Sequence, residues 1–191
     1  MGIPPLIWQN ALITFALSII LGTIIGFIAF LPFFLTLLFL LMMIAVGVVF
    51  DIVGIAVAAS EERPLHAMGA DRVVGSGQAI WLVRRADRVA NFCNDVIGDV
   101  SGTISGAITV IISTALAVRL GLERSLLSVL AIALTAALTV AGKAFGKAYA
   151  LRSPHTVVLT VGRFLSKIGW PRAGQRRGSG RGRSRKGQGR G

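Results

Sequence analysis

Apolar residues follow one another with almost no interruption through the first third of the chain. The run from Leu6 to Ala59 contains one charged side chain, Asp51, near its end. Because a helix needs about 20 apolar residues to cross a hydrocarbon core, this run is long enough for two helices. Pro32 stands among aromatic residues near the middle of the run and predicts a tight turn. We therefore expect one helix over residues 7–30 and a second over residues 33–60.

The pattern turns polar over residues 60–90, where charged residues, Pro64 and a Gly-Ser-Gly sequence interrupt the apolar run. Residues 78–89 mix apolar side chains with three basic ones, Arg84, Arg85 and Arg88. This mixture is typical of a short helix that lies on an anionic membrane surface. A solvated connector would show a similar mixture, so both interpretations stay open.

Two further apolar stretches predict a third helix over residues 93–118 and a fourth over residues 125–145. The link between them, residues 119–124, is short. Residues 151–170 then place a few basic side chains among apolar ones and predict a surface helix, which Pro171 ends.

The chain divides into four segments on this pattern. They are an extra N-terminal transmembrane helix (residues 1–32), a three-helix transporter-like core (33–152), a juxtamembrane amphipathic helix (153–170) and a disordered basic tail (171–191). The tail is rich in Gly, Ser, Arg, Lys and Gln and cannot bury enough apolar surface to fold. We expect it to bind anionic lipid headgroups rather than a specific nucleic acid, with a role as a mere spacer left open.

Composition fixes the class of protein. The 191 residues are 54% hydrophobic and 15% charged, with a mean hydropathy of +0.75, which is too apolar for an ordinary soluble domain. We expect an all-α integral membrane protein with about four transmembrane helices in the cell membrane. The polar loop and the tail hold most of the basic residues, which predicts that both, and thus the C-terminus, are cytoplasmic. No nucleotide-binding, zinc or nucleophile motif occurs, so we do not expect an enzyme.

Polar and small residues interrupt the third predicted helix in a regular way. At helical spacing, four residues form a stripe that allows close helix contact, namely Asn94, Gly98, Gly102 and Gly106. A second line next to it holds Asn91, Asp95 and Asp99. Carboxylates inside a membrane are costly, so we expect this line to face a packed neighbour rather than lipid.

Three stretches resemble the membrane domain of the cyclin M and CorB/CorC magnesium-transport family. They are VVFDIVGIAVAASEERPLHAM, ADRVANFCNDVIGDVSG and GKAFGKAYALRSP, which occur in the family's order within residues 46–167. The pattern that ends the family's domain has matches at Gly142, Lys147, Arg152 and Pro154. The resemblance implies a dimeric cation transporter in which polar side chains of these helices hold a dehydrated magnesium ion.

The chain also departs from the family's pattern. Asn94 matches its asparagine-rich turn, whereas Asp95 stands where a second asparagine is usual. The family's Ser-Gly-Ser-Glu cluster is replaced by the sequence from Asp51 to Gly54, and its later glutamate by Lys143. No stretch predicts the cytoplasmic CBS domains of many members, so a separate regulatory subunit is an expected partner.

Depth along the helices brings the candidate site residues together. At about 1.5 Å per residue, Asp51 and Asp99 each lie roughly 12 Å inside the cytoplasmic end of their helices, and Lys143 lies at comparable depth. The expected cation ligands are Asp51, Asn94, Asp95 and Asp99, with Lys143 as a built-in counterion or gate. The resemblance implies Mg²⁺, while the charge balance also admits a monovalent cation or a proton. The alternative is a structural or interaction membrane protein that retains the fold, with an Asp–Lys network tying its helices together.

Overall fold

The computed structural model describes residues 5–170, which form helices and no strands. The elements in chain order are α1 (Pro5–Ile28), α2 (Phe33–Ala59), α3 (Glu62–Ala70), α4 (Ser76–Val83), α5 (Ala86–Asn91), the π-helix η1 (Phe92–Gly98), α6 (Asp99–Leu120), α7 (Arg124–Arg152) and α8 (Pro154–Lys167). The predicted disordered tail lies outside the described residues.

Four helical segments are long and apolar enough to cross a membrane, which confirms the count made from hydropathy. They are Trp8–Ile28, Phe33–Ala59, Ala86–Leu120 and Arg124–Arg152. The third runs without a break through α5, η1 and α6 and is longer than predicted. The fourth also continues past the predicted end at residue 145, through a less apolar stretch that contains Lys147, Tyr149 and Arg152.

The turn at Pro32 is confirmed. The N–H groups of Phe30 and Leu31 donate to Phe27 O (3.2 Å) and Ile28 O (3.0 Å) as α1 tightens and ends. Pro32 has no N–H to continue the helix, and its ψ of 143° turns the chain into α2. Its carbonyl then accepts the N–H of Thr36 at 3.1 Å, which starts the new helix.

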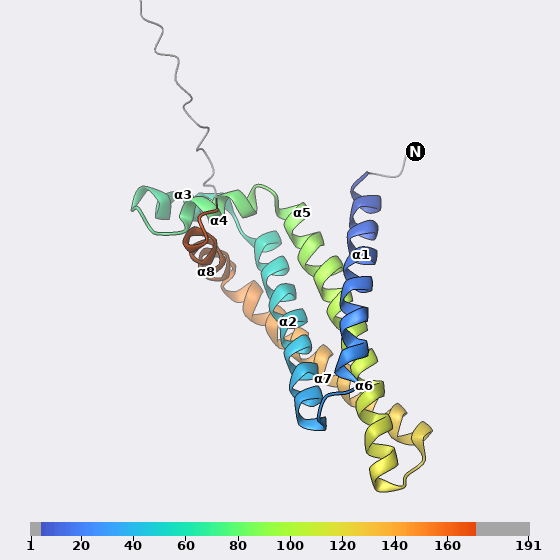
Figure 1. Ribbon diagram of the computed structural model, residues 1–191. Coiled ribbons are helices and arrows are strands. Elements are labelled where there is room, and N and C mark those ends of the chain that lie inside the picture. The colour runs from blue at the N-terminus through green and yellow to red at the C-terminus, as the bar shows by residue number, and fades with distance from the viewer. Residues whose placement is uncertain (1–4, 171–191) are drawn as a thin grey trace, which may run out of the picture.

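The long helices form a bundle with a layer of short helices at one end (Figure 1). Helix α2 is central and packs against α6 and α7, while α1 lies against α6 and η1. Helices α3, α4 and α8 make up what we call the end layer, which lies at the end of the molecule where α1 begins. The α1–α2 and α6–α7 turns lie at the opposite end.

Two clusters of buried apolar side chains hold these parts together. One joins α1, α2 and α6 and consists of Ile28, Leu40, Ile44, Val100, Ile104, Ile108 and Ile112. The other joins the end layer to α2 and α7 and includes Val57, Leu65, Ile80, Ala150 and Val158. The first cluster joins three helices, and close packing among its side chains stabilises the contact.

Glycines allow α2 and α7 to approach closely. A Cβ at Gly142 would come within 3.0 Å of Val48 Cγ2, and one at Gly146 within 2.7 Å of Ile52 Cδ1. The G-x-x-x-G spacing of Gly142 and Gly146 is the sequence signal for such a contact.

Residues 60–90 fold differently from the single helix predicted over residues 78–89. They form α3, α4 and α5, and α4 ends where Arg85 leaves helical geometry at φ −121°, ψ 32°. Leu65 and Ala79 are fully buried within the end layer. The segment is therefore packed against α2 and α8, and the interpretation as a solvated connector is wrong.

Candidate functional site

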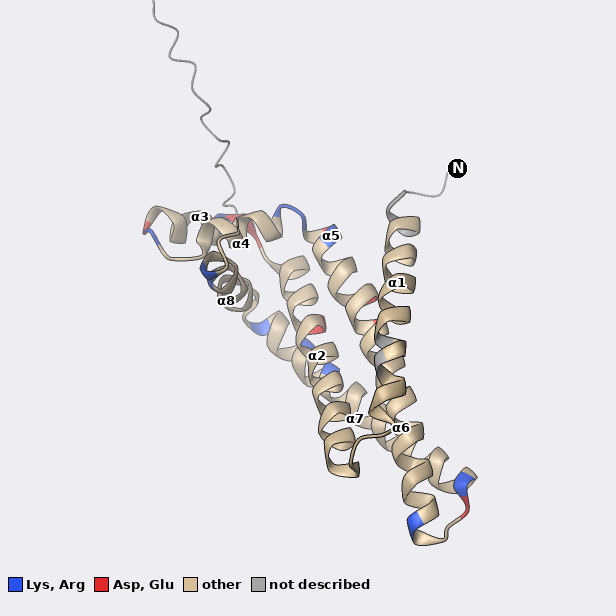
Figure 2. Ribbon diagram, in the orientation of Figure 1, with Lys and Arg blue, Asp and Glu red and all other residues tan. Residues whose placement is uncertain are grey.

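Two charged side chains meet between the central helix and the last long helix. Lys143 Nζ on α7 lies 3.8 Å from Asp51 Oδ1 on α2. This separation is an ion contact without a hydrogen bond, because N–H···O bonds have donor–acceptor distances near 2.9 Å. The two side chains are 33% and 17% exposed, respectively. Figure 2 shows acidic and basic positions midway along the long helices as well as near their ends.

An amide oxygen is buried one turn away from this pair. Asn94 on η1 presses its side-chain amide against the backbone of Gly54 on α2, so closely that a Cβ at Gly54 would overlap it. Asn94 Oδ1 is buried and has no hydrogen-bond partner among the described residues. An unpaired buried carbonyl costs free energy, which makes it a candidate cation ligand.

The side chain of Lys143 also lies close to η1, at Gly98. A Cβ at Gly98 would lie 3.6 Å from Lys143 Nζ, so the absent side chain leaves room for the ammonium. We call Asp51, Asn94 and Lys143 the polar group. Asp51 and Lys143 are therefore in contact, and Asn94 packs against Gly54, three residues along α2 from Asp51.

Asp95 and Asp99 do not join the polar group. Both are exposed on the surface of the described chain, so the prediction that they face a packed neighbour is wrong for the single chain. The faces of this helix next to them are taken by α2 and α7. The wide turns of η1 also break the four-residue spacing on which the prediction rested.

Only half of the predicted stripe of Asn94, Gly98, Gly102 and Gly106 contacts another helix. Gly98 meets Lys143, whereas a Cβ at Gly102 or at Gly106 would find nothing within 4 Å. Both glycines line a groove of about 280 Å³ between α6 and α7. Hydroxyl pairs hold these two helices together beside and beyond the groove, Thr109 with Thr135 and Ser113 with Ser128, each at 3.0 Å.

The donor set of the polar group limits which ion it can bind. The described residues contain no group of three or more acidic, histidine or cysteine side chains placed to share a metal. One carboxylate and one amide oxygen suit a Mg²⁺ ion that keeps several of its waters. The ammonium of Lys143 stands beside that carboxylate, so the charge there is already balanced.

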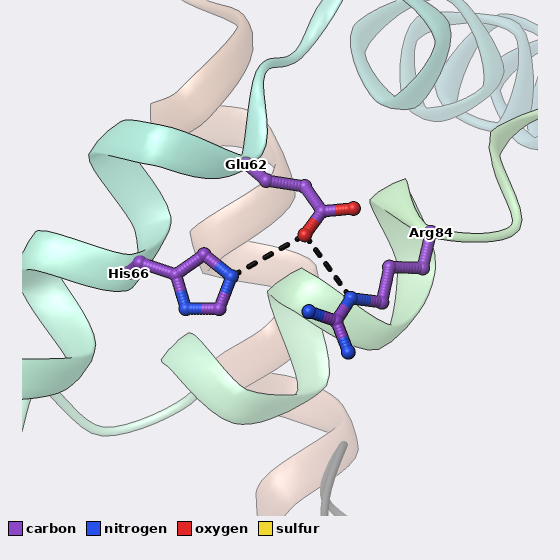
Figure 3. Close-up of polar contacts among 3 residues, drawn as sticks. All are labelled: Glu62, His66 and Arg84. Atoms are coloured by element: carbon purple, nitrogen blue, oxygen red, sulfur yellow. Dashed lines mark hydrogen bonds and ion pairs between the residues drawn. The ribbon is translucent and has the colours of Figure 1, made fainter.

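A second polar cluster lies in the end layer (Figure 3). Glu62 accepts a hydrogen bond from Arg84 Nε at 3.0 Å and lies 3.3 Å from His66 Nε2. The Arg84 hydrogen bond holds the pKa of Glu62 below its ordinary value; desolvation opposes this shift, and the contact with His66 adds a smaller lowering. This cluster ties α3 to α4.

Comparison with protein-family models, curated proteins and solved structures finds no match for this chain. The resemblance to the magnesium-transport family thus stays a prediction from the quoted stretches. Sequence reasoning missed the role of Gly54, which no spacing rule marks. It also missed the Gly142 and Gly146 contact, although the G-x-x-x-G signal was present.

Proposed function

We propose that the four long helices cross a membrane and that the protein is a cation transporter of the magnesium type, with the polar group as its ion site. Asp51 and Asn94 would supply oxygen ligands, and Lys143 would occupy the position of the ion until it moves away. The observation that carries this proposal is the buried, unpartnered Asn94 Oδ1, which lies against Gly54, three residues along α2 from the Asp51 that contacts Lys143. Ionisable residues within apolar spans usually mark ion pathways.

The second candidate is a structural or interaction membrane protein. The 3.8 Å contact of Lys143 with Asp51 supports it, because the pair is neutral without any added ion. An internal ion pair of this kind can specify how helices pack without taking part in transport.

A charge reversal at Lys143 separates these two functions. Lys143→Glu places a second carboxylate beside Asp51 and removes the internal cation, so the site should recruit Mg²⁺ or be destabilised by repulsion. We expect the thermal unfolding midpoint of this variant in detergent to rise with millimolar Mg²⁺ and to fall with chelator. The parent protein should be nearly indifferent to both.

Two controls make the comparison specific. Lys143→Met removes the ammonium without adding a ligand, and Arg152→Glu makes the same charge change at the exposed end of the same helix. Neither should respond to Mg²⁺ as Lys143→Glu does. An equal response of Lys143→Glu and the parent would favour the structural function.

The proposed assembled form is a homodimer built on the outward face of η1 and α6. Asp95 and Asp99 are exposed there, and carboxylates facing lipid are costly. Thr109 on α6 and Thr135 on α7 lie at the same level, because their hydroxyls are paired. The two helices are antiparallel, so residues before Thr109 lie level with residues after Thr135. Lys147, exposed on α7, is therefore level with these acids. A twofold axis along the membrane normal keeps every residue at its depth, so each copy would offer a cation to the other's carboxylates.

A further inference from the structure

A cavity opens in the end layer where α3 turns into α4. It has a volume of about 460 Å³, within the range of small-molecule sites. Its lining includes Gly69, Arg72, Ser76, Gly77 and Gln78, and no acidic residue of the described chain. The cavity is separate from the polar group between the long helices.

The turn that forms the cavity wall is held in place by α8. Gly75 adopts a left-handed conformation with φ +91°, and a Cβ there would come 2.5 Å from Arg163 N. Gly162 on α8 packs equally closely against Gly75. Arg72 is also left-handed, with φ +57°, which is uncommon for a residue with a side chain. The turn therefore sets the position from which the guanidinium of Arg72 extends.

Hydrogen-bond donors without partners line the same cavity. The Ser76 N–H donates to Val73 O at 3.2 Å, but no described residue accepts the N–H of Gly77 or Gln78 in the first turn of α4. Ser76 is only 8% exposed and lines the cavity, and none of the side-chain hydrogen bonds of the described residues includes its hydroxyl. Its Oγ lies over Gly69, where a Cβ would be 3.7 Å away.

We propose that this cavity binds a phosphate group, with Arg72 and the Ser76 hydroxyl as the side chains that recognise it. Backbone N–H groups at a helix start suit an anion, and a guanidinium can donate two parallel hydrogen bonds to phosphate oxygens. The phosphate belongs either to a soluble ion or ester or to the headgroup of an anionic lipid. The site lies beside the ends of the long apolar helices, where a lipid headgroup would be placed.

Thermal unfolding of the full chain in neutral detergent tests the site with two probes, inorganic phosphate and phosphatidylglycerol, each compared with phosphatidylcholine. Work at about 0.5 M salt, where the Debye length is about 4 Å, suppresses weak attraction to other basic residues. We expect saturable stabilisation of the parent protein. Arg72→Gln and Ser76→Ala should each weaken the apparent affinity about tenfold, because each removes a bond to a charged group.

Further variants keep the test decisive. Arg72→Gly suits the left-handed backbone, so it should fold well and still lose the response. Arg63→Gln removes an exposed arginine of α3 that does not line the cavity and should respond like the parent. A response to inorganic phosphate supports a soluble ligand, and a response to phosphatidylglycerol alone supports a headgroup. The proposal is wrong if neither probe stabilises the parent, or if Arg72→Gln and Arg63→Gln respond alike.

Discussion

The contact between Gly54 and Asn94 shows how strongly single residues determine the polar group. The amide of Asn94 fills the space that a side chain at position 54 would need, with Asn94 Cγ 2.8 Å from the place of a Cβ. Glycine is therefore required on α2 if Asn94 is to lie between the helices. The polar group depends on this absent methyl group as much as on its charged members.

Gly54→Ala should lower the thermal unfolding midpoint in detergent, because the added methyl group must displace the Asn94 amide. Overpacking of this kind costs about 1–3 kcal/mol. The double variant Gly54→Ala, Asn94→Ala should recover part of the loss, since alanine leaves room for the methyl group. Gly26→Ala, with nothing within 4 Å of its added Cβ, is the control and should unfold like the parent. A Gly54→Ala variant as stable as the parent would contradict the contact.

The sequence predicted part of this site for a simple reason. Depth along a helix depends only on residue count, so counting alone places Asp51 and Lys143 at one level. Rotation about the helix axis is less predictable, because the π-helical turns of η1 change it within a few residues. Asp95 and Asp99 therefore face away from the position that regular helical spacing implied.

At the scale of the elements, the sequence pattern predicted the four long helices and the helix that forms α8, but not the division and packing of residues 60–90. Length and apolarity are local properties, and Pro32 marks its turn by chemistry alone. The division of residues 60–90 into three helices depends on contacts with α8, far along the chain. Leu65 and Ile80 are buried by those contacts, which no local pattern reports.

The α3–α4 contact should weaken in acid through Glu62. Its pKa is lowered in the folded protein by the Arg84 hydrogen bond, so its stabilising effect is present above the unfolded value of about 4.3 and is lost as pH falls through the lower folded value. Glu62→Gln removes this titration. The unfolding midpoints of the parent and of Glu62→Gln should therefore differ slightly at pH 6 and converge in acid, as the pH falls through the lowered pKa of Glu62. A difference that does not change with pH would exclude this contribution.

Gly102→Leu should weaken the proposed dimer, because leucine fills the groove between α6 and α7 and projects from the outward face. The expected loss of dimer affinity is about tenfold or more. Light scattering of the detergent-solubilised protein across a dilution series measures it.

The matched variant is Gly26→Leu on α1. Gly22 and Gly26 have the same four-residue spacing, and an added Cβ at either finds nothing within 4 Å. This face of α1 is thus the alternative interface for a second copy of the chain. Loss of the dimer in Gly26→Leu but not in Gly102→Leu would place the interface on α1 and contradict the proposed face.

For the whole molecule, an even number of long helices agrees with the start of α1 and helix α8 lying at one end of the bundle. Helix α1 begins, and α8 lies, at the same end of the bundle (Figure 1). The end layer, its flanking turns and the adjoining ends of α5 and α7 carry eight of the twelve basic residues of the described chain, whereas the α6–α7 link has Arg119 and Arg124 beside Glu123. Basic segments stay on the cytoplasmic side of a membrane, so the end layer should be cytoplasmic.

Cysteine labelling in intact cells can test this orientation. Cys93 is buried and can be replaced by alanine, after which single cysteines are placed at two exposed positions, Ala70→Cys in the end layer and Leu122→Cys in the α6–α7 turn. A membrane-impermeant maleimide should label Leu122→Cys from outside and reach Ala70→Cys only after permeabilisation, because four spans put the two turns on opposite sides. Labelling of Ala70→Cys in intact cells, with Leu122→Cys protected, would show that the protein has the opposite orientation in the membrane. The proposed phosphate cavity would then face the exterior, and the ion site would lie near the outer surface of the membrane.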